Sequence, residues 1–181
     1  MKKIIASLLL IGFIFASCEK DDICDPTTPT TPRLVVQFFA KDNISVTRRT
    51  TNLKIIANEF EDDTKPLLNG SGGTTWNDTL VYLPLRLDKN TTTYRLILNA
   101  DDTNATNDRT DTLEINYTKN DIYISRACGF KTVFDLFGDP LQDPFVLNNS
   151  PNATAGNWIS DIQVIPTQLN DENEVHIKIF F

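Results

Sequence analysis

The sequence predicts an all-β protein, built as an antiparallel β-sandwich of the immunoglobulin-like type. From Arg33 onward, short apolar runs alternate with clusters of Asn, Asp, Thr, Gly and Pro, and no window repeats its apolar residues with the period of a helix. Short strands joined by turn-rich loops are typical of sandwiches and of barrels. A closed β-barrel is therefore the alternative. Residues 33–181 are expected to form one domain, because this length is enough for a single hydrophobic core.

The first half of this domain contains four expected strands. They are residues 34–39, 53–57, 80–87 and 94–98. Residues 58–78 separate the second from the third and are expected to form a long polar loop. The third strand has an apolar residue at every odd position, and a short polar turn leads from it into the fourth. Residues 80–98 are therefore expected to form a β-hairpin.

The second half contains three more strands before the last hairpin. They are residues 113–118, 122–127 and 130–137. The polar triplet Lys119, Asn120 and Asp121 predicts a turn between the first two of them. Residues 138–157 are rich in Gly, Pro and Asn and are expected to form a loop.

The last expected hairpin pairs residues 158–167 with residues 174–181. The alternation in its second strand predicts one face directed to the core and one to water. The core-facing residues would be Val175, Ile177, Ile179 and Phe181, and the water-facing residues would be Glu174, His176 and Lys178. His176 is the one histidine in the sequence, and no nucleophile lies near it along the chain, so no catalytic residue is predicted.

The N-terminal segment has the features of a secretion signal. Lys2 and Lys3 precede an apolar run at residues 4–15, which is shorter than the roughly 20 residues that span a bilayer. Small residues follow, and then Cys18. The expected signal peptide is residues 1–17; an ordinary cleaved signal with a chance cysteine is the alternative reading.

The sequence around Cys18 resembles the lipobox of bacterial lipoproteins, which implies cleavage before the cysteine and its acylation. Three acyl chains would hold the chain on a membrane, because stable attachment takes two or more. The stretch after Cys18, Glu19-Lys20-Asp21-Asp22, resembles the acidic export signal of surface lipoproteins of the Bacteroidota, in which Lys-Asp-Asp implies the outer leaflet of the outer membrane. The periplasmic leaflet is the alternative. Residues 18–32, which end in a Thr/Pro-rich stretch, are expected to be a tether.

The charge of the chain disfavours nucleic acid as a partner. The full sequence carries 17 Lys and Arg against 24 Asp and Glu, a formal charge of −7. Removing Lys2 and Lys3 with the signal lowers this from −7 to −9. Binding to phosphates needs clustered basic residues, which an acidic chain of this kind does not offer.

Two cysteines remain once Cys18 is acylated. Cys24 and Cys128 form an even pair in a compartment that permits disulfides. A bond between them would close a loop of roughly 100 residues, worth up to about 4.7 kcal/mol in the chain-entropy model. Two free thiols are the alternative. No Cys/His spacing predicts a metal site, and no cofactor is expected.

Residues 101–111 form the one stretch dense in oxygen ligands. Calcium takes six to eight such oxygens, yet this loop lacks the glycine of an EF-hand and has Leu113 at the twelfth position from Asp102. A solvated loop is the preferred interpretation, and whether the loop binds calcium stays open.

Two tripeptides match the Asp-Thr-apolar pattern of O-glycosylation in the Bacteroidota. They predict modification at Thr79 and Thr112, each expected where a loop enters a strand. A chance match in a Thr-rich chain is the alternative. A surface for sugar stacking would require four aromatic residues to share one face: Trp76, Trp158, Tyr82 and Tyr123. Separate core or rim positions are the preferred interpretation.

Several stretches together resemble a family of small lipoproteins of the Bacteroidota with a domain of unknown function. They are residues 18–24, the Thr/Pro tether, residues 121–132 and residues 173–178. The resemblance supports the lipid at Cys18 and the pair Cys24 and Cys128. The expected function is that of an outer-membrane lipoprotein, not an enzyme, serving as an accessory or structural subunit beside an outer-membrane barrel or another envelope protein. A surface glycan-binding module is the alternative.

Overall fold

The computed structural model describes residues 23–58, 65–100, 105–150, 153–165 and 168–181. Within these ranges the chain consists of strands and loops, with one short 3₁₀ turn. The elements are β1 (Leu34–Ala40), β2 (Asn43–Thr47), β3 (Lys54–Ala57), β4 (Leu80–Leu83), β5 (Thr91–Leu98), η2 (Ala105–Asn107), β6 (Arg109–Asn116), β7 (Thr118–Ser125), β8 (Gly129–Asp135), β9 (Phe145–Leu147), β10 (Asp161–Val164), β11 (Gln168–Leu169) and β12 (Ile177–Phe180).

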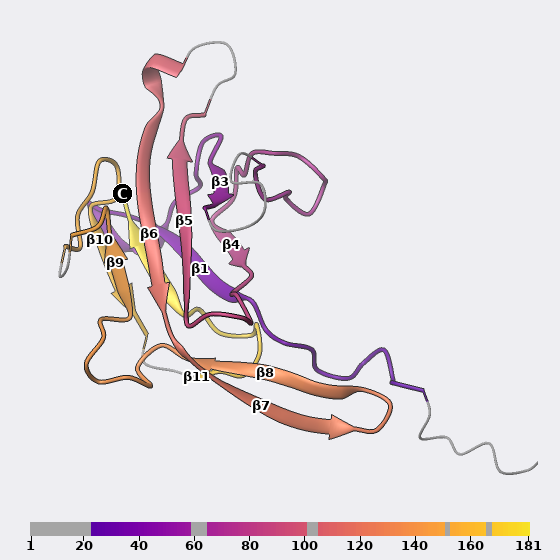
Figure 1. The fold of residues 1–181 in the computed structure, drawn as a ribbon. Coiled ribbons are helices and arrows are strands. Elements are labelled where there is room, and N and C mark those ends of the chain that lie inside the picture. The colour runs from indigo at the N-terminus through magenta and orange to yellow at the C-terminus, as the bar shows by residue number, and fades with distance from the viewer. Residues whose placement is uncertain (1–22, 59–64, 101–104, 151–152, 166–167) are drawn as a thin grey trace, which may run out of the picture.

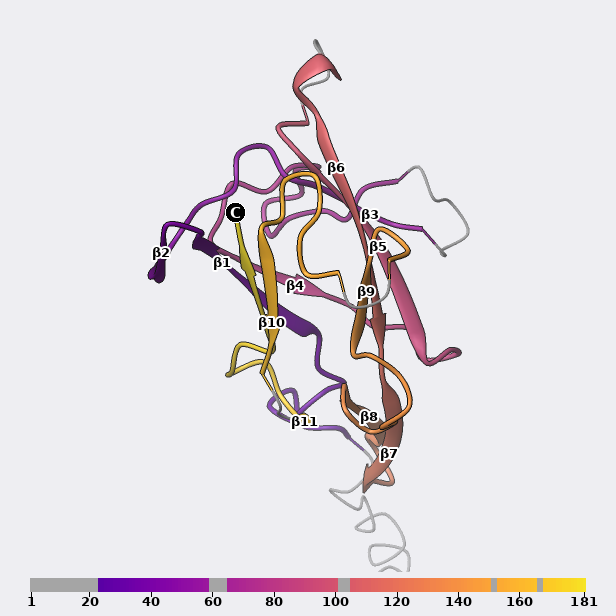
Figure 2. The ribbon, with the colours of Figure 1, turned by 90° about the vertical axis from the view of Figure 1, so that its left-hand side faces the viewer.

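The first sheet is organised around β1 (Figures 1 and 2). Its order is β10-β12-β1-β2, and β4 also pairs with β1. The pairing of β1 with β12 is parallel, with Val36 opposite Ile177, whereas β4 pairs with β1 in the antiparallel sense. The sequence of β1 is a nearly continuous apolar run, which suits a central strand covered on both faces.

The second sheet has the order β3-β5-β6-β9, and all its pairings are antiparallel. In β5, side chains alternate strictly between half-buried and buried positions. Tyr94 and Leu96 point inward from β5, and Leu113 and Ile115 point inward from β6. These residues lie in one cluster with Leu34, Val36 and Phe38 of the first sheet, so the two sheets enclose a common core.

The third sheet forms an arm that projects from the body of the molecule (Figure 1). Its order is β11-β8-β7, and the β7–β8 hairpin supplies most of its length. We call the β7–β8 hairpin, residues 118–135, the arm. At its base, Phe134 is buried and its ring meets the ring of Tyr117 edge to face, with 5.2 Å between the centroids. The base of the arm is therefore part of the core.

The prediction of an all-β sandwich is confirmed. The structure is built almost entirely from strands, and in the described ranges no sheet closes on itself, so the alternative of a closed barrel is wrong. The predicted pairing of the last two strands is also confirmed, because β10 pairs with β12. The connection over residues 168–173 is not a simple turn, because Gln168 and Leu169 form β11 and pair with β8. Phe181 packs edge to face against Phe38 and Trp158, as expected for a core residue. The immunoglobulin-like strand order stays a prediction.

The expected hairpin over residues 80–98 is wrong. β4 pairs with β1 in the first sheet, whereas β5 pairs with β3 and β6 in the second. β4 ends at Leu83, because the following Pro84 has no amide hydrogen to continue a ladder. The Tyr94 hydroxyl donates to the Pro84 carbonyl and holds the chain where it crosses between the sheets.

The expected turn at residues 119–121 is wrong as well. β7 runs through this triplet, which pairs with residues 132–134 of β8. Both faces of β7 are largely open to solvent, so polar residues do not interrupt it. The Thr132 hydroxyl also donates to the Asp121 carboxylate across the two strands, at 2.6 Å. Three short strands, β2, β9 and β11, were not expected from the sequence.

Candidate functional site

The arm is joined covalently to the start of the described chain. Cys24 and Cys128 form a disulfide, with 4.8 Å between their Cα atoms and a sequence separation of 104. The predicted bond is confirmed, and the alternative of two free thiols is wrong. Cys128 lies in the turn at the end of the arm, just before Gly129 with its positive φ of 69°. The disulfide therefore fixes the tether to the end of the arm.

The tether also follows the edge of β8. The Thr132 N–H donates to the Thr31 hydroxyl at 3.0 Å, and the Thr28 hydroxyl lies 3.6 Å from the sulfur of Cys128. Pro32 is buried. At the entry to β1, the Arg33 guanidinium donates twice to the Glu172 carboxylate, at 2.8 and 2.6 Å, and the Arg33 backbone N–H donates once, at 2.9 Å. The described part of the tether is therefore held to the arm at Cys24, Thr28 and Thr31 and does not project as a separate stalk.

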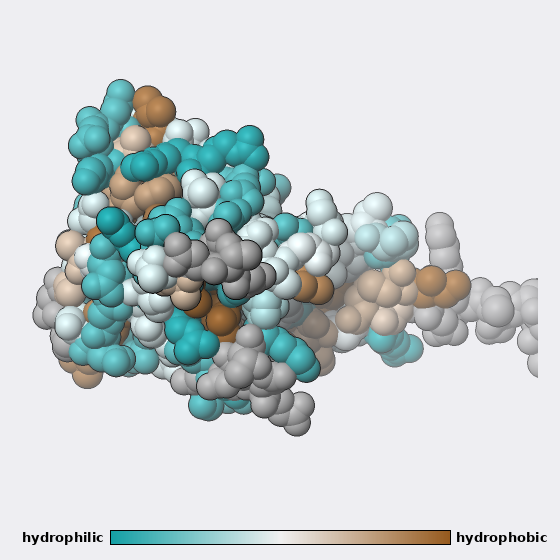
Figure 3. All heavy atoms as spheres, turned by 90° about the horizontal axis from the view of Figure 1, so that it is seen from above, coloured by the Kyte–Doolittle hydropathy of each residue, from teal (hydrophilic) through white to brown (hydrophobic). Residues whose placement is uncertain are grey.

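Apolar side chains lie on the surface of the arm. Tyr123 and Phe130 face each other across the two strands, with 5.3 Å between their ring centroids. Tyr123 is 56% exposed and Phe130 is 68% exposed, and Ile122 beside them is 37% exposed. Figure 3 shows apolar residues along the end of the molecule that extends toward the N-terminus. We call Ile122, Tyr123 and Phe130 the arm-tip cluster.

The charges at the arm tip differ in sign from those of the whole chain. Residues 122–132 contain Arg126 and Lys131 and no acidic residue. Two acidic residues flank the arm tip in the described chain: Asp121, which accepts from the Thr132 hydroxyl, and Asp25, which accepts from the backbone and hydroxyl of Thr27. The arm tip is thus an apolar and basic surface on an acidic protein.

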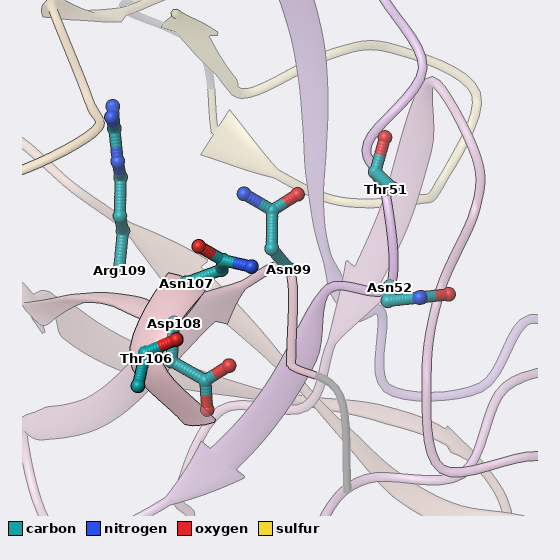
Figure 4. A pocket seen from close by; sticks show the side chains of 7 residues that line it. All are labelled: Thr51, Asn52, Asn99, Thr106, Asn107, Asp108 and Arg109. Atoms are coloured by element: carbon teal, nitrogen blue, oxygen red, sulfur yellow. The ribbon is translucent and has the colours of Figure 1, made fainter. Parts of the chain in front are cut away.

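A polar pocket of about 430 Å³ lies at the other end of the second sheet (Figure 4). It is lined by Thr51, Asn52, Asn99, Thr106, Asn107, Asp108 and Arg109. Asn52 and Asn99 adopt positive φ values of 44° and 59°, a conformation that asparagine tolerates better than most residues. In Figure 4, Asn99 stands between Thr51 and Asn52 on one side and residues 106–109 on the other. The lining offers amide, hydroxyl and charged groups and no aromatic ring.

His176 does not face water as predicted. It is 1% exposed, and its Nδ1 accepts a hydrogen bond of 3.0 Å from the Val35 N–H. The proton of the neutral ring must therefore be on Nε2. Burial lowers the pKa of His176 below its usual value near 6.5, although Asp171, Glu174 and Glu172 act in the opposite direction. The alternating pattern of residues 174–181 gave the wrong prediction for His176, because β12 pairs with β1, a strand covered on both faces.

Asp111, the last residue of the acidic loop, is fully buried and belongs to β6. Its two carboxylate oxygens accept from four N–H groups, those of the Asn148 side chain and of the backbone at Asn157, Trp158 and Ile159, at 2.6–3.0 Å. These oxygens hold the segment before β10 in place and are not open calcium ligands. Residues 101–104 of the same loop lie outside the described residues.

The structure places the two predicted glycosylation residues differently. Thr79 is half-buried and directly precedes β4, as expected. Thr112 is the fourth residue of β6, so its expected place at the entry of a strand is wrong. The N–H of Thr112 donates to the Asn148 side chain and its carbonyl accepts from the Asn148 N–H. Modification of either residue stays a prediction.

The four aromatic residues considered for sugar stacking occupy different environments. Trp76 is half-buried, and its indole N–H donates to the Leu67 carbonyl at 3.4 Å. Trp158 is buried in the core, and its indole N–H donates to the Leu96 carbonyl at 3.2 Å. Tyr123 lies on the arm, and Tyr82 lies under the guanidinium of Arg33, with 4.7 Å from Arg33 Cζ to the ring centroid. These positions agree with the preferred expectation of separate core and rim sites.

The described ranges contain no cluster of three or more His, Cys, Asp or Glu side chains suited to a metal ion. They also contain no helix long and apolar enough to cross a membrane. The predicted signal peptide, residues 1–17, and the predicted lipid attachment residue Cys18 lie outside the described residues.

Comparison with known proteins yields one family. The profile of a family of unknown function, DUF6452, matches residues 52–181, which include β3 to β12 and Cys128. No curated protein and no solved structure matches the chain. Cys18 and Cys24 precede the matched range, so the resemblance of the N-terminal segment to lipoproteins of the Bacteroidota stays a prediction. Because the match covers well over half of the sequence, the chain belongs to the DUF6452 family of unknown function.

Proposed function

We propose that the protein is an outer-membrane lipoprotein, anchored through acyl chains on Cys18, and that it acts as a non-catalytic accessory or structural subunit of a cell-envelope assembly. Its partner would be an outer-membrane barrel or another envelope protein. The surface-exposed outer leaflet is the preferred location. No cofactor enters this proposal.

The observation that carries the proposal is the disulfide between Cys24 and Cys128. Structural disulfides persist in oxidising compartments such as the bacterial periplasm and the cell surface. This one joins the folded domain to a residue only six positions after Cys18. Such a bond would hold the domain against its anchor, an arrangement that suits a subunit working close to a membrane.

The proposal is tested by fractionating cells that produce the wild-type chain or the variant Cys18→Ala. The wild-type protein should require detergent for release from the membrane fraction, and the variant should be recovered without detergent. Cys128→Ser serves as the matched control, because it also removes a cysteine and should leave the protein in the membrane fraction. Detergent-dependent recovery of Cys18→Ala would refute the lipid anchor.

Surface glycan binding is the second candidate function, and the pocket around Asn99 favours it. Amide and hydroxyl groups from three segments converge there and can exchange hydrogen bonds with sugar hydroxyls. Binding of the purified protein to a panel of bacterial and host glycans tests this candidate. The variant Asn99→Asp should weaken any binding by at least tenfold, whereas Leu141→Ser, at an exposed residue outside the pocket, should have no effect. Equal binding by both variants would remove the pocket from consideration.

A further inference from the structure

We infer that the tip of the arm is a membrane-contacting surface, whose aromatic and basic side chains lie in the headgroup region of the bilayer that carries the lipid anchor. This inference rests on the proposed anchor at Cys18 and adds a second point of contact. It also gives the domain a defined orientation on the membrane.

Only a short length of chain lies between the anchor and the arm. Five residues separate Cys18 from Cys24. Six residue steps span at most about 20 Å when fully extended. Cys24 is bonded to Cys128 at the turn of the arm, with 4.8 Å between their Cα atoms. The turn of the arm therefore cannot move away from the bilayer surface by more than this short reach.

The side chains of the arm-tip cluster have the chemistry of a membrane-contacting surface. Exposed apolar groups that lie together mark an interaction surface, and aromatic side chains are enriched at the headgroup level of membranes. Tyr123 and Phe130 form an exposed pair of this kind, and Ile122 extends it. Ile23, next to the bonded Cys24, is 83% exposed and adds an apolar side chain on the tether.

The charges of the arm tip also favour contact with a membrane. Arg126 and Lys131 are the charged residues between positions 122 and 132, and both are basic. Lipid phosphates attract such residues when they lie within about 10 Å of the surface. The body, residues 33–117 and 136–181, carries 11 Lys and Arg against 18 Asp and Glu and would be repelled by an anionic surface. The charge distribution of the folded domain therefore favours contact through the arm tip and not through the body.

The arm is fixed to the body firmly enough to transmit this orientation. The Lys119 ammonium donates to the Leu87 carbonyl at 2.7 Å, and β11 pairs with β8 at the base. β6, which leads into the arm through Tyr117, carries Arg109 of the polar pocket at its opposite end (Figure 1). With the arm tip on the bilayer, the pocket would be directed away from it.

The test uses full-length lipidated protein in vesicles of phosphatidylethanolamine and phosphatidylglycerol that contain brominated acyl chains, which quench nearby tryptophan. A tryptophan is introduced by Phe130→Trp at the arm tip or, as a matched control, by Ile44→Trp at an exposed position of β2. The signal of Trp76 and Trp158 is common to both and is subtracted with the wild-type protein. Quenching for Phe130→Trp should be at least twofold stronger than for Ile44→Trp.

Tyr123→Trp gives a second reading if Phe130→Trp perturbs the hairpin. Equal quenching at the arm tip and at β2, in protein that stays bound to the vesicles, overturns the membrane-contact inference and leaves the arm tip to a protein partner. Protein that does not bind the vesicles in any variant instead overturns the lipid anchor. The two failures are therefore distinguishable.

Discussion

Asp111 is the residue whose replacement we expect to cost the most stability. Its carboxylate accepts from four N–H groups that no other acceptor serves in the described structure. Leaving buried donors without a charged partner costs about 3 kcal/mol or more. Asp111→Ala should therefore lower the free energy of unfolding by at least this amount, measured by urea denaturation of the purified domain.

Asp143→Asn is the matched control for Asp111, because Asp143 is exposed. Surface substitutions of this kind usually change stability by less than about 0.5 kcal/mol. Gly156→Ala gives an independent check, since its new Cβ would collide with the Asp111 carboxylate. If Asp111→Ala were no more destabilising than Asp143→Asn, the bonding described for Asp111 would be wrong.

His176 predicts a pH dependence of stability. Its pKa is lowered in the folded protein by burial, so between the folded value and about 6.5 the unfolded chain binds more protons than the folded chain. Stability contributed by the neutral ring is fully present above about pH 6.5 and is lost as the pH falls through this window. The melting temperature should therefore decrease from pH 7.5 to pH 5.5.

His176→Asn isolates this effect, because the amide oxygen of asparagine can replace Nδ1 as the acceptor for the Val35 N–H and does not titrate. The variant should show a smaller decrease in melting temperature over the same range. Equal decreases in both proteins would mean that His176 is not the group responsible.

At the residue scale, the chemical role of a residue could be predicted from the sequence more readily than its burial. Cys24 and Cys128 could be paired because they were the two cysteines left over. The burial of His176 and Asp111 could not be predicted, because it depends on contacts with residues distant in sequence. His176 contacts a residue 141 positions away, and Asp111 contacts residues 37 to 48 positions away. The local sequence around a polar residue in an alternating strand does not show whether its side chain is buried against a hydrogen-bonding partner or exposed to solvent.

At the scale of elements, the disulfide is expected to stabilise the domain by fixing the tether to the arm. The chain-entropy model gives up to about 4.7 kcal/mol for a loop near 100 residues, and measured disulfides often give less. Reduction should therefore lower the melting temperature by several degrees. Thiol counting on denatured protein from the envelope should find no free thiol at Cys24 or Cys128.

Cys24→Ser and Cys128→Ser provide the controls, since each removes the same bond. The two single variants and the double variant should melt at the same temperature as the reduced wild type. Two free thiols in the native protein, or unequal single variants, would contradict a structural bond between these residues.

The positions of the strands could be predicted from the sequence more readily than their pairing partners. Alternation located β5, β6 and β12, because one face of each packs on the core. The partners of β4 could not be predicted, because Pro84 ends the strand and sends the chain to the other sheet. The sequence predicts a turn at residues 119–121, inside β7, because three consecutive polar residues resemble a turn. A strand with both faces exposed tolerates such residues. The parallel pair β1–β12 joins the two ends of the domain and has no local signal.

At the scale of the whole molecule, the N-terminal segment is predicted to determine location, and the charged residues after Cys18 are predicted to direct surface display. Replacing Lys20, Asp21 and Asp22 with Ala should leave acylation intact and reduce digestion by protease added to whole cells. The wild-type chain on intact cells is the reference, and lysed cells control for intrinsic protease resistance. Equal digestion of both chains on intact cells would favour the periplasmic leaflet.

The central claim is that the mature chain begins at an acylated Cys18, and mass spectrometry of protein extracted from the membrane tests it most directly. The account predicts an N-terminal peptide that starts at Cys18 and carries a diacylglyceryl group on sulfur and an acyl chain on nitrogen. The same digest should contain Cys24 linked to Cys128. A chain that starts at another residue, or an unmodified Cys18, would contradict the account.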